Sequence, residues 1–143
     1  MTCVVDASVA LKWFLADEQN GAQALRIVER GEALAAPDLL VAEVCNAGWR
    51  LLRSGRIARV QFDNIPTALP RYFAELCGIV ALAPRAAAIA AQLDHPIYDC
   101  FYLALAEARQ SLMVTADARL LARLAGSPWS ASTVHLADYQ PSG

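Results

Sequence analysis

Short apolar runs alternate along the chain with segments in which apolar residues recur every three or four positions. The runs predict five strands, at residues 2–5, 33–36, 78–82, 112–115 and 133–136. The intervening segments predict helices, at residues 7–15, 21–30, 38–53, 58–68, 70–76, 85–93, 97–110 and 117–124. Asp38 is expected to cap the helix at 38–53 or to lie in its first turn.

The predicted strands are apolar on both faces rather than alternating between apolar and polar positions. This pattern is typical of a parallel sheet that helices cover on both sides. In such sheets, sites form at the carboxyl ends of the strands. The 143 residues contain no internal repeat, low-complexity segment or linker, so we expect a single domain over residues 1–143.

The composition agrees with a largely buried sheet or an oligomer interface, because 57% of the residues are hydrophobic and 18% are charged. No apolar run approaches the roughly 20 residues that span a bilayer. The chain reaches Asp6 without a basic segment, so its start reads as a strand rather than a signal peptide. We therefore expect a cytoplasmic protein with no membrane contact. The cysteines stand singly in apolar runs and are expected to be buried free thiols: Cys3, Cys45, Cys77 and Cys100.

Four carboxylates fall where the predicted strands or the adjoining helices reach one edge of the sheet. Asp6 directly follows the first strand, and Asp117 lies two residues after the strand at 112–115. Asp99 is in the first turn of the helix that leads into that strand, and Glu43 is in the second turn of the helix after the second strand. Because the carboxyl ends of parallel strands share one edge, all four are expected to converge.

Apolar neighbours surround Asp6, Glu43 and Asp99, and an unpaired carboxylate is costly to bury in such surroundings. Carboxylates that are brought together also repel one another. A divalent cation resolves both problems, and Mg²⁺ takes oxygen ligands while needing only one or two direct carboxylates. Structural alternatives stay open: Asp99 and Asp117 could cap helices, and Glu43 could pair with an arginine. Asp6 has fewer such uses, because it ends a buried strand.

Polar residues accompany these carboxylates at short spacings. Ser8 and Thr115, each two residues from one of the carboxylates, could hydrogen-bond a carboxylate or a phosphate. Asn46 is one turn after the glutamate and faces the same way. Lys12 is the only lysine and could approach a phosphate, although a solvated surface lysine is the commoner case.

The net charge of −2 gives no global sign of nucleic-acid binding. Four of the arginines nevertheless fall in one short stretch: Arg50, Arg53, Arg56 and Arg59. A solvated helix end that complements the helix dipole is the structural explanation of this stretch. Metal-ligand spacing is absent around the two histidines: His95 and His135. No glycine-rich phosphate loop and no Ser–His–Asp or Cys–His arrangement is present.

The chain resembles the PIN domain and, within it, the VapC toxins of bacterial type II toxin–antitoxin modules. The resemblance rests on three segments: VVDASVALKWFLADE, PDLLVAEVCNAGWRLLRSGRI and HPIYDCFYLALAEARQSLMVTADARLLARL. It covers nearly the whole chain, and the ordered set is more specific than any one segment. By this resemblance, the family's acidic positions fall on Asp6, Glu43, Asp99 and Asp117. The accompanying polar positions fall on Ser8, Asn46 and Thr115.

The resemblance implies a three-layer α/β/α sandwich with a central parallel sheet of four to five strands. It implies one or two Mg²⁺ or Mn²⁺ ions at the four carboxylates, and endonucleolytic cleavage of RNA with a metal-activated water. It also implies a homodimer and a VapB-type antitoxin whose C-terminal segment covers the active-site groove. The candidates for contact with RNA phosphates or an acidic antitoxin segment are Lys12, Arg50 and Arg53.

Two other functions fit the same residues. A housekeeping PIN-type nuclease would act on structured RNA or DNA, although no helical arch or further nucleic-acid domain is visible. A non-catalytic module would use the acids to bind the arginines of a partner protein. RNA as the substrate follows from the resemblance alone, because the carboxylate pattern does not distinguish RNA from DNA.

Overall fold

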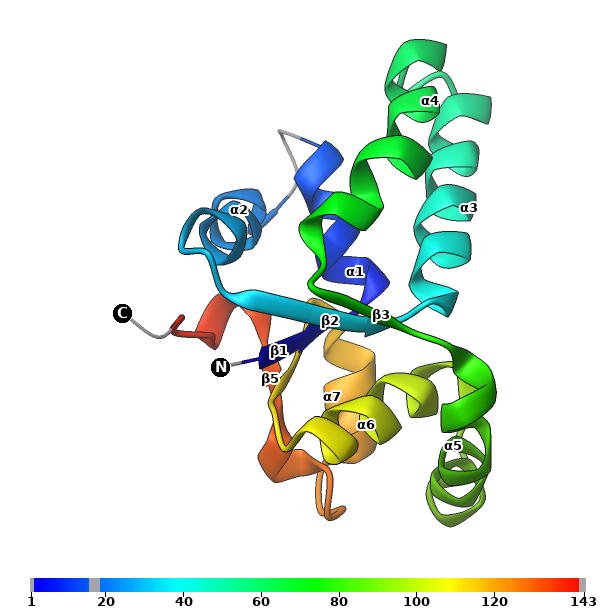
Figure 1. The fold of residues 1–143 in the computed structure, drawn as a ribbon, viewed down its shortest axis with the longest axis vertical. Coiled ribbons are helices and arrows are strands. Elements are labelled where there is room, and N and C mark those ends of the chain that lie inside the picture. Colours follow the sequence, from blue (N-terminus) through cyan, green and yellow to red (C-terminus); the bar gives the residue numbers. More distant parts are fainter. Residues whose placement is uncertain (1, 16–18, 142–143) are drawn as a thin grey trace.

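A five-stranded parallel sheet forms the centre of the computed structural model, which describes residues 2–15 and 19–141 (Figure 1). The strands are β1 (Thr2–Val5), β2 (Ala33–Pro37), β3 (Glu75–Cys77), β4 (Met113–Thr115) and β5 (Thr133–His135). They lie in the order β3-β2-β1-β4-β5, and every pair is parallel. The expectation of a parallel sheet of four to five strands is confirmed.

Helices cover both faces of the sheet (Figure 1). One face carries α1 (Ala7–Ala10), α2 (Gly21–Glu29), α3 (Leu39–Arg53) and α4 (Arg59–Ala68). The other carries α5 (Ile79–Leu93), α6 (Ile97–Arg109) and α7 (Ala118–Leu124). Short 3₁₀ helices join these elements: η1 (Leu11–Phe14), η2 (Leu69–Tyr72), η3 (Ser130–Ser132) and η4 (Leu136–Asp138). The architecture is therefore the expected α/β/α sandwich.

The strand order creates a crevice near the middle of the sheet. From β1 the chain winds outward through β2 to β3, then returns to β4 on the other side of β1 and goes on to β5. The two directions separate between β1 and β4, where open parallel sheets form their binding crevices. Val5 lies opposite Val114 in the register, so Asp6, directly after β1, and Thr115, the last residue of β4, lie at the same level. The N–H of Asp6 donates to the carbonyl of Val114 at 3.3 Å.

Helix α6 is enclosed by its neighbours. Seven consecutive residues, from Cys100 to Ala106, are buried, because the helix contacts β1 and β2 on one side and α5 on another. A helix in such a place needs apolar residues around most of its circumference. Each fully buried leucine contributes about 1.5–3 kcal/mol, so Leu103 and Leu105 anchor the helix firmly. Side chains at the start of α6 are therefore presented from a rigid support.

The expected strand at residues 78–82 is wrong. This apolar run begins α5, whose buried positions recur at helical spacing: Leu82, Ala86 and Ile89. Val80, by contrast, is 87% exposed. A short apolar run fits a buried strand and one face of a helix equally well. The helix predicted at 85–93 is thus the later part of α5, and Pro84 lies inside it.

The third strand of the sheet is instead β3, which overlaps the end of the segment that predicted a helix at residues 70–76. Its residues are only half-buried and include Glu75, so the hydrophobic pattern there is weak. Pairing with β2 makes it a strand, with Ala35 opposite Glu75 and Pro37 opposite Cys77. Backbone hydrogen bonds, rather than side-chain burial, define this edge strand.

Two smaller expectations also change. Asp38 stands at the N-cap position of α3, but its carboxylate accepts from the N–H of Ile79, at the start of α5, at 3.2 Å. The four cysteines are free, as expected, but Cys45 and Cys77 are only partly buried.

Within the described ranges, we find no helix with the length and apolar character that crossing a membrane requires.

Candidate active site

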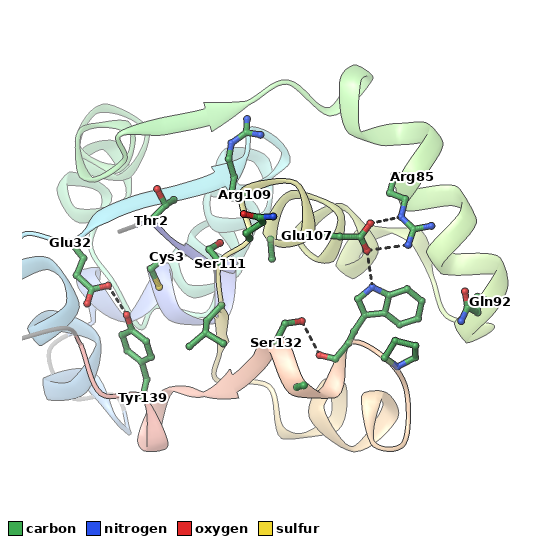
Figure 2. A pocket seen from close by; sticks show the side chains of 16 residues that line it. Thr2, Cys3, Glu32, Arg85, Gln92, Glu107, Arg109, Ser111, Ser132 and Tyr139 are labelled. Carbon is green, nitrogen blue, oxygen red and sulfur yellow. Dashed lines mark hydrogen bonds and ion pairs between the residues drawn. The ribbon is translucent and has the colours of Figure 1, made fainter.

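Two of the pockets lie at opposite ends of the parallel strands. The larger has a volume of about 670 Å³ and opens at the amino ends (Figure 2). Its acidic side chains are already paired, because Glu107 accepts two hydrogen bonds from Arg85 and Glu32 accepts one from Tyr139. None of the predicted site residues lines this pocket.

The smaller pocket has a volume of about 160 Å³ and lies at the carboxyl ends of the strands. Asp6 follows β1, Asp117 follows β4, Glu43 projects from α3, and Asp99 projects from the first turn of α6. All four carboxylates line the pocket, together with Ala7, Ser8 and Tyr102. The expected convergence of the four is therefore observed, while their chemical roles stay predictions.

Asp6 is held by hydrogen bonds at both carboxylate oxygens. Its Oδ1 accepts from the Ser8 hydroxyl at 2.5 Å and from the backbone N–H groups of Ser8 and Val9 at 3.1 and 3.3 Å. Its Oδ2 accepts from the hydroxyl of Thr115. Thr115 in turn accepts from the N–H of Asp117 at 3.0 Å. The predicted contacts of Ser8 and Thr115 with a carboxylate are confirmed, and one buried hydroxyl ties the ends of β1 and β4 together.

These bonds give Asp6 a structural use that the sequence did not reveal, because its side chain caps α1. The expectation of few structural uses was wrong. Burial, and to a smaller extent the charge of Asp99, raises the pKa of Asp6 from 3.8 to about 6, while the hydrogen bonds from Ser8 and Thr115 act to lower it. A carboxylate whose charge is disfavoured in this way gains from a nearby cation.

Glu43 is held by a tyrosine that the sequence did not single out. The hydroxyl of Tyr102, on α6, donates to Oε1 of Glu43 at 2.6 Å, and Tyr102 is 1% exposed. Burial raises the pKa of Glu43, the bond from Tyr102 lowers it, and the charge of Asp99 raises it. Burial, followed by the charge of Glu43, raises the pKa of Tyr102 far above its ordinary range, so the hydroxyl remains a donor. The partner of Glu43 is therefore a tyrosine rather than the arginine that the sequence left open. The sequence signal for this role was the position of Tyr102 three residues after Asp99.

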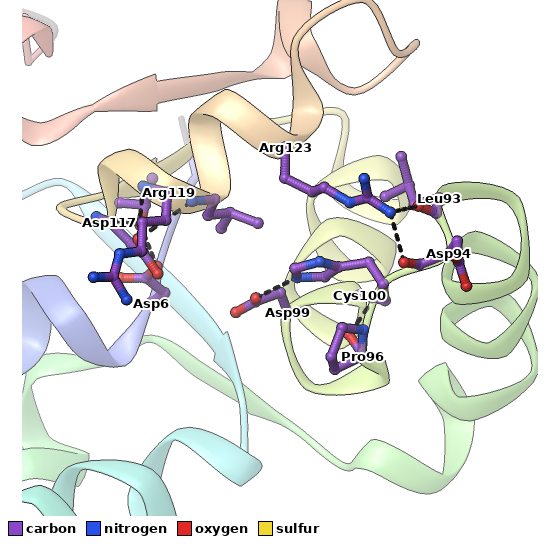
Figure 3. A network of polar contacts seen from close by, with 12 residues as sticks. Asp6, Leu93, Asp94, Pro96, Asp99, Cys100, Asp117, Arg119 and Arg123 are labelled. Atoms are coloured by element: carbon purple, nitrogen blue, oxygen red, sulfur yellow. Dashed lines mark hydrogen bonds and ion pairs between the residues drawn. The ribbon is translucent and has the colours of Figure 1, made fainter.

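Asp99 does not cap α6. It lies in the first turn of α6 (Figure 3). Its Oδ2 is 2.7 Å from Nε2 of His95 in the preceding turn. The sequence assigned no role to His95, yet it contacts a pocket carboxylate. The spacing of four residues between His95 and Asp99 was visible, but Pro96 separates them and hid the turn geometry.

Asp117 does cap a helix. Its Oδ1 accepts from the N–H groups of Arg119 and Leu120, the second and third residues of α7, at 2.9 and 3.2 Å. The structural alternative is therefore confirmed for Asp117. Capping engages only Oδ1, so it is compatible with a second role for the side chain in the pocket that it lines.

The remaining candidates lie outside the pocket lining. Asn46, one turn after the pocket glutamate, is exposed. Lys12 lies on η1. Arg50 and Arg53 are exposed in the last turns of α3, and the guanidinium of Arg53 is 5.5 Å from the ring centroid of Trp49. Arg50 is roughly 10 Å along the helix from the glutamate, so only an extended ligand could reach both.

The donors of the pocket suit a hard divalent cation, because its acidic side chains offer only oxygen. Within residues 2–15 and 19–141, no three acidic, histidine or cysteine side chains are already gathered as a metal-binding group. Mg²⁺ needs only one or two direct carboxylates and keeps several waters. At about 30 Å³ per water, the pocket of about 160 Å³ has room for such a hydrated ion. The residues present therefore fit the cation by their chemistry.

Comparison with known proteins agrees with this geometry. Residues 3–127 match the family model described as the PIN domain, a range that includes all four pocket carboxylates. The chain belongs to the PIN domain family. Similar curated proteins are named as VapC ribonucleases. This PIN domain is 30% identical to ribonuclease VapC3 of Pyrobaculum aerophilum over 122 residues, which are 84% of the chain and 92% of that relative.

A second relative comes from a bacterium. Ribonuclease VapC9 of Mycobacterium tuberculosis is 36% identical over 117 residues, covering 82% of this PIN domain and 87% of VapC9. Among solved structures, a protein from Pyrobaculum aerophilum aligns with a TM-score of 0.68 at 22% identity, covering 96% of this chain and 93% of that one. A chain of a toxin–antitoxin complex from Klebsiella pneumoniae aligns with a TM-score of 0.67 at 18% identity, covering 94% and 97%. These two likenesses support the fold.

Proposed function

We propose that this PIN domain is a metal-dependent endoribonuclease and the toxin of a toxin–antitoxin pair. The observation that carries the proposal is the convergence of four carboxylates in one pocket at the carboxyl ends of the strands: Asp6, Glu43, Asp99 and Asp117. Identity of 30% and 36% to proteins named as VapC ribonucleases supports RNA as the substrate.

The chain's own part in the reaction is to hold the carboxylates and to admit RNA. One or two Mg²⁺ or Mn²⁺ ions, when bound, would make a water nucleophilic and neutralise charge on the scissile phosphate. Ser8 and Thr115 fix the orientation of Asp6 through three hydrogen bonds. Without a cation, the acidic pocket repels the phosphates of RNA, so substrate binding depends on the ion as well.

Partners are proposed from the surface outside the pocket. Basic side chains there are candidates for RNA phosphates or for an acidic segment of a VapB-type antitoxin: Lys12, Arg50 and Arg53. The helices α3 and α4 also expose large apolar side chains, with Trp49 at 45% and Val60 at 75%, which supports a homodimer or an antitoxin contact on this side. The proposed site of action is the cytoplasm, where RNA is available.

Removing divalent cations is expected to stop RNA cleavage by the purified chain. A mixed RNA is incubated with Mn²⁺, with Mg²⁺ and with EDTA, and cleavage is followed on gels. We expect the rate in EDTA to be lower by about 100-fold or more and to recover when excess Mn²⁺ is added. A DNA strand of matched sequence serves as the substrate control.

Three other outcomes would contradict parts of the proposed function. Undiminished cleavage in EDTA would contradict metal dependence. Binding of Mn²⁺ without cleavage of any RNA would favour the non-catalytic module, and equal cleavage of the DNA strand would favour a general nuclease.

Growth arrest on induction, relieved by a co-expressed partner from the neighbouring reading frame, tests the toxin role.

A further inference from the structure

Two pocket carboxylates are each held at one oxygen by a side chain from α6 or from the turn before it. Tyr102 donates to Oε1 of Glu43 at 2.6 Å, and Nε2 of His95 lies 2.7 Å from Oδ2 of Asp99. Among the described residues, the other oxygen of each carboxylate has no hydrogen-bond partner. Oε2 of Glu43 and Oδ1 of Asp99 are therefore the oxygens available to a ligand of the pocket.

Tyr102 is placed by the core. Its position on α6 lies within the run of seven buried residues, and the side chain itself is 1% exposed. The contact with Glu43 joins α6 on one face of the sheet to α3 on the other, across 59 residues of chain. Because the phenol ring is fixed by packing, its hydroxyl gives Glu43 one preferred orientation.

His95 is placed by a second set of contacts. Arg123, on α7, donates from Nη2 to the carbonyls of Leu93 and Asp94, both at 2.7 Å (Figure 3). These bonds hold the turn between α5 and α6 against α7. The imidazole that follows the turn reaches Asp99 and is only 17% exposed. Core packing thus fixes the tyrosine that holds Glu43, and the contacts of Arg123 fix the turn before the histidine that holds Asp99.

We propose that Tyr102 and His95 are positioning residues, which turn the second oxygens of Glu43 and Asp99 toward a divalent cation in the pocket. The inference rests on the proposed metal-dependent function and extends it to residues that do not themselves bind the ion. The charges of Glu43 and Asp99 repel each other and would otherwise turn the two carboxylates apart. Groups that orient metal-binding carboxylates are typically worth about 10- to 100-fold in metal affinity or activity.

Tyr102→Phe tests the first of these residues, because it removes one hydroxyl and keeps the packed ring. Calorimetric titration with Mn²⁺ is expected to give a dissociation constant roughly tenfold higher than that of the wild-type chain. The rate of RNA cleavage should fall at limiting Mn²⁺ and recover as Mn²⁺ is raised. A purely structural role would not produce this rescue by the ion.

The chain offers a matched control for this variant. Tyr139 donates to Oε2 of Glu32 at 2.5 Å, at the opposite end of the sheet (Figure 2). Tyr139→Phe therefore deletes the same kind of bond, and it is expected to leave the affinity for Mn²⁺ unchanged. Thermal unfolding of both variants in EDTA separates any loss of stability from the loss of metal binding.

His95→Ala and His95→Gln test the second residue. Alanine removes the contact with Asp99, and Mn²⁺ affinity is expected to fall by roughly tenfold. The glutamine amide can still donate, so His95→Gln should recover most of that loss. His135→Gln is the control, because this histidine instead accepts from the N–H of Ala137 at 3.0 Å.

The outcomes separate this inference from the function on which it rests. A wild-type chain that binds no Mn²⁺ overturns both. A wild-type chain that binds Mn²⁺ and cuts RNA, with Tyr102→Phe and His95→Ala binding Mn²⁺ equally well, overturns the positioning roles and leaves the proposed function standing.

Discussion

Asp6→Asn is expected to remove most RNA cleavage while leaving the chain folded. The amide keeps the size of the side chain but loses the charge, and its nitrogen cannot bind a cation. We expect the rate to fall by about 100- to 1000-fold, and Asp99→Asn to behave in the same way. Asp138→Asn changes an exposed acid of η4 and should cut RNA as fast as the wild-type chain. If both pocket variants cut at the wild-type rate, the four-carboxylate site is wrong.

Asp6→Asn is also expected to change how the metal-free stability depends on pH. Burial raises the pKa of Asp6 from 3.8 to about 6, so folding favours the protonated acid. The stability that this group contributes is therefore fully present below about pH 4 and is lost as the pH rises through about 6. The loss amounts to roughly 3 kcal/mol at most, and the asparagine variant does not suffer it.

Denaturant unfolding in EDTA measures this difference. Between about pH 5 and pH 8, the wild-type chain should lose more free energy of unfolding than Asp6→Asn. Added Mn²⁺ should then stabilise the wild-type chain and leave the variant unchanged, because a ligand stabilises only the state that binds it. Identical pH dependence of the two chains would show that Asp6 does not titrate in this range.

Thr115→Val is expected to lower both stability and activity. Valine fills the same volume but removes the hydroxyl that donates to Oδ2 of Asp6 and accepts from the N–H of Asp117. Since Thr115 is fully buried, no water replaces the missing partner, and the free energy of unfolding should fall by about 1–3 kcal/mol. Loss of orientation at Asp6 is expected to lower RNA cleavage by roughly 10- to 100-fold.

Two further variants isolate the role of this hydroxyl. Thr133→Val removes the hydroxyl of another buried threonine, which donates to the carbonyl of Trp129 at 3.0 Å. It should lose stability but keep its cleavage rate. Thr115→Ser retains the hydroxyl and should keep most of both. Wild-type cleavage by Thr115→Val would show that this bond does not serve the reaction.

The position of the pocket could be predicted because two of its carboxylates closely follow strands that the sequence shows clearly. The strands β1 and β4 are buried on both faces, so their apolar runs stand out, and Asp6 and Asp117 follow them closely. Asp99 could be placed because Pro96 marks the start of α6. The helix-capping alternative held for Asp117 and failed for Asp99, since local spacing cannot show which backbone N–H a carboxylate will meet.

Contacts between distant parts of the chain could not be predicted. Thr115 and Asp6 are 109 residues apart, and Tyr102 and Glu43 are 59 apart. No periodic pattern links such pairs, so the sequence did not identify Tyr102 as the partner of Glu43. The same limit hid β3, because an edge strand is defined by its backbone partner and needs few apolar side chains.

The enclosure of α6 has a consequence for how the site fails. Amide hydrogens of a helix that is buried from Cys100 to Ala106 are expected to exchange with solvent only when the whole fold opens. Tyr102 lies within this buried run, so local fraying cannot release its bond to Glu43 while the core persists. The geometry of the site and the integrity of the fold are therefore lost in a single cooperative event, and partly unfolded chains should carry no residual nuclease activity.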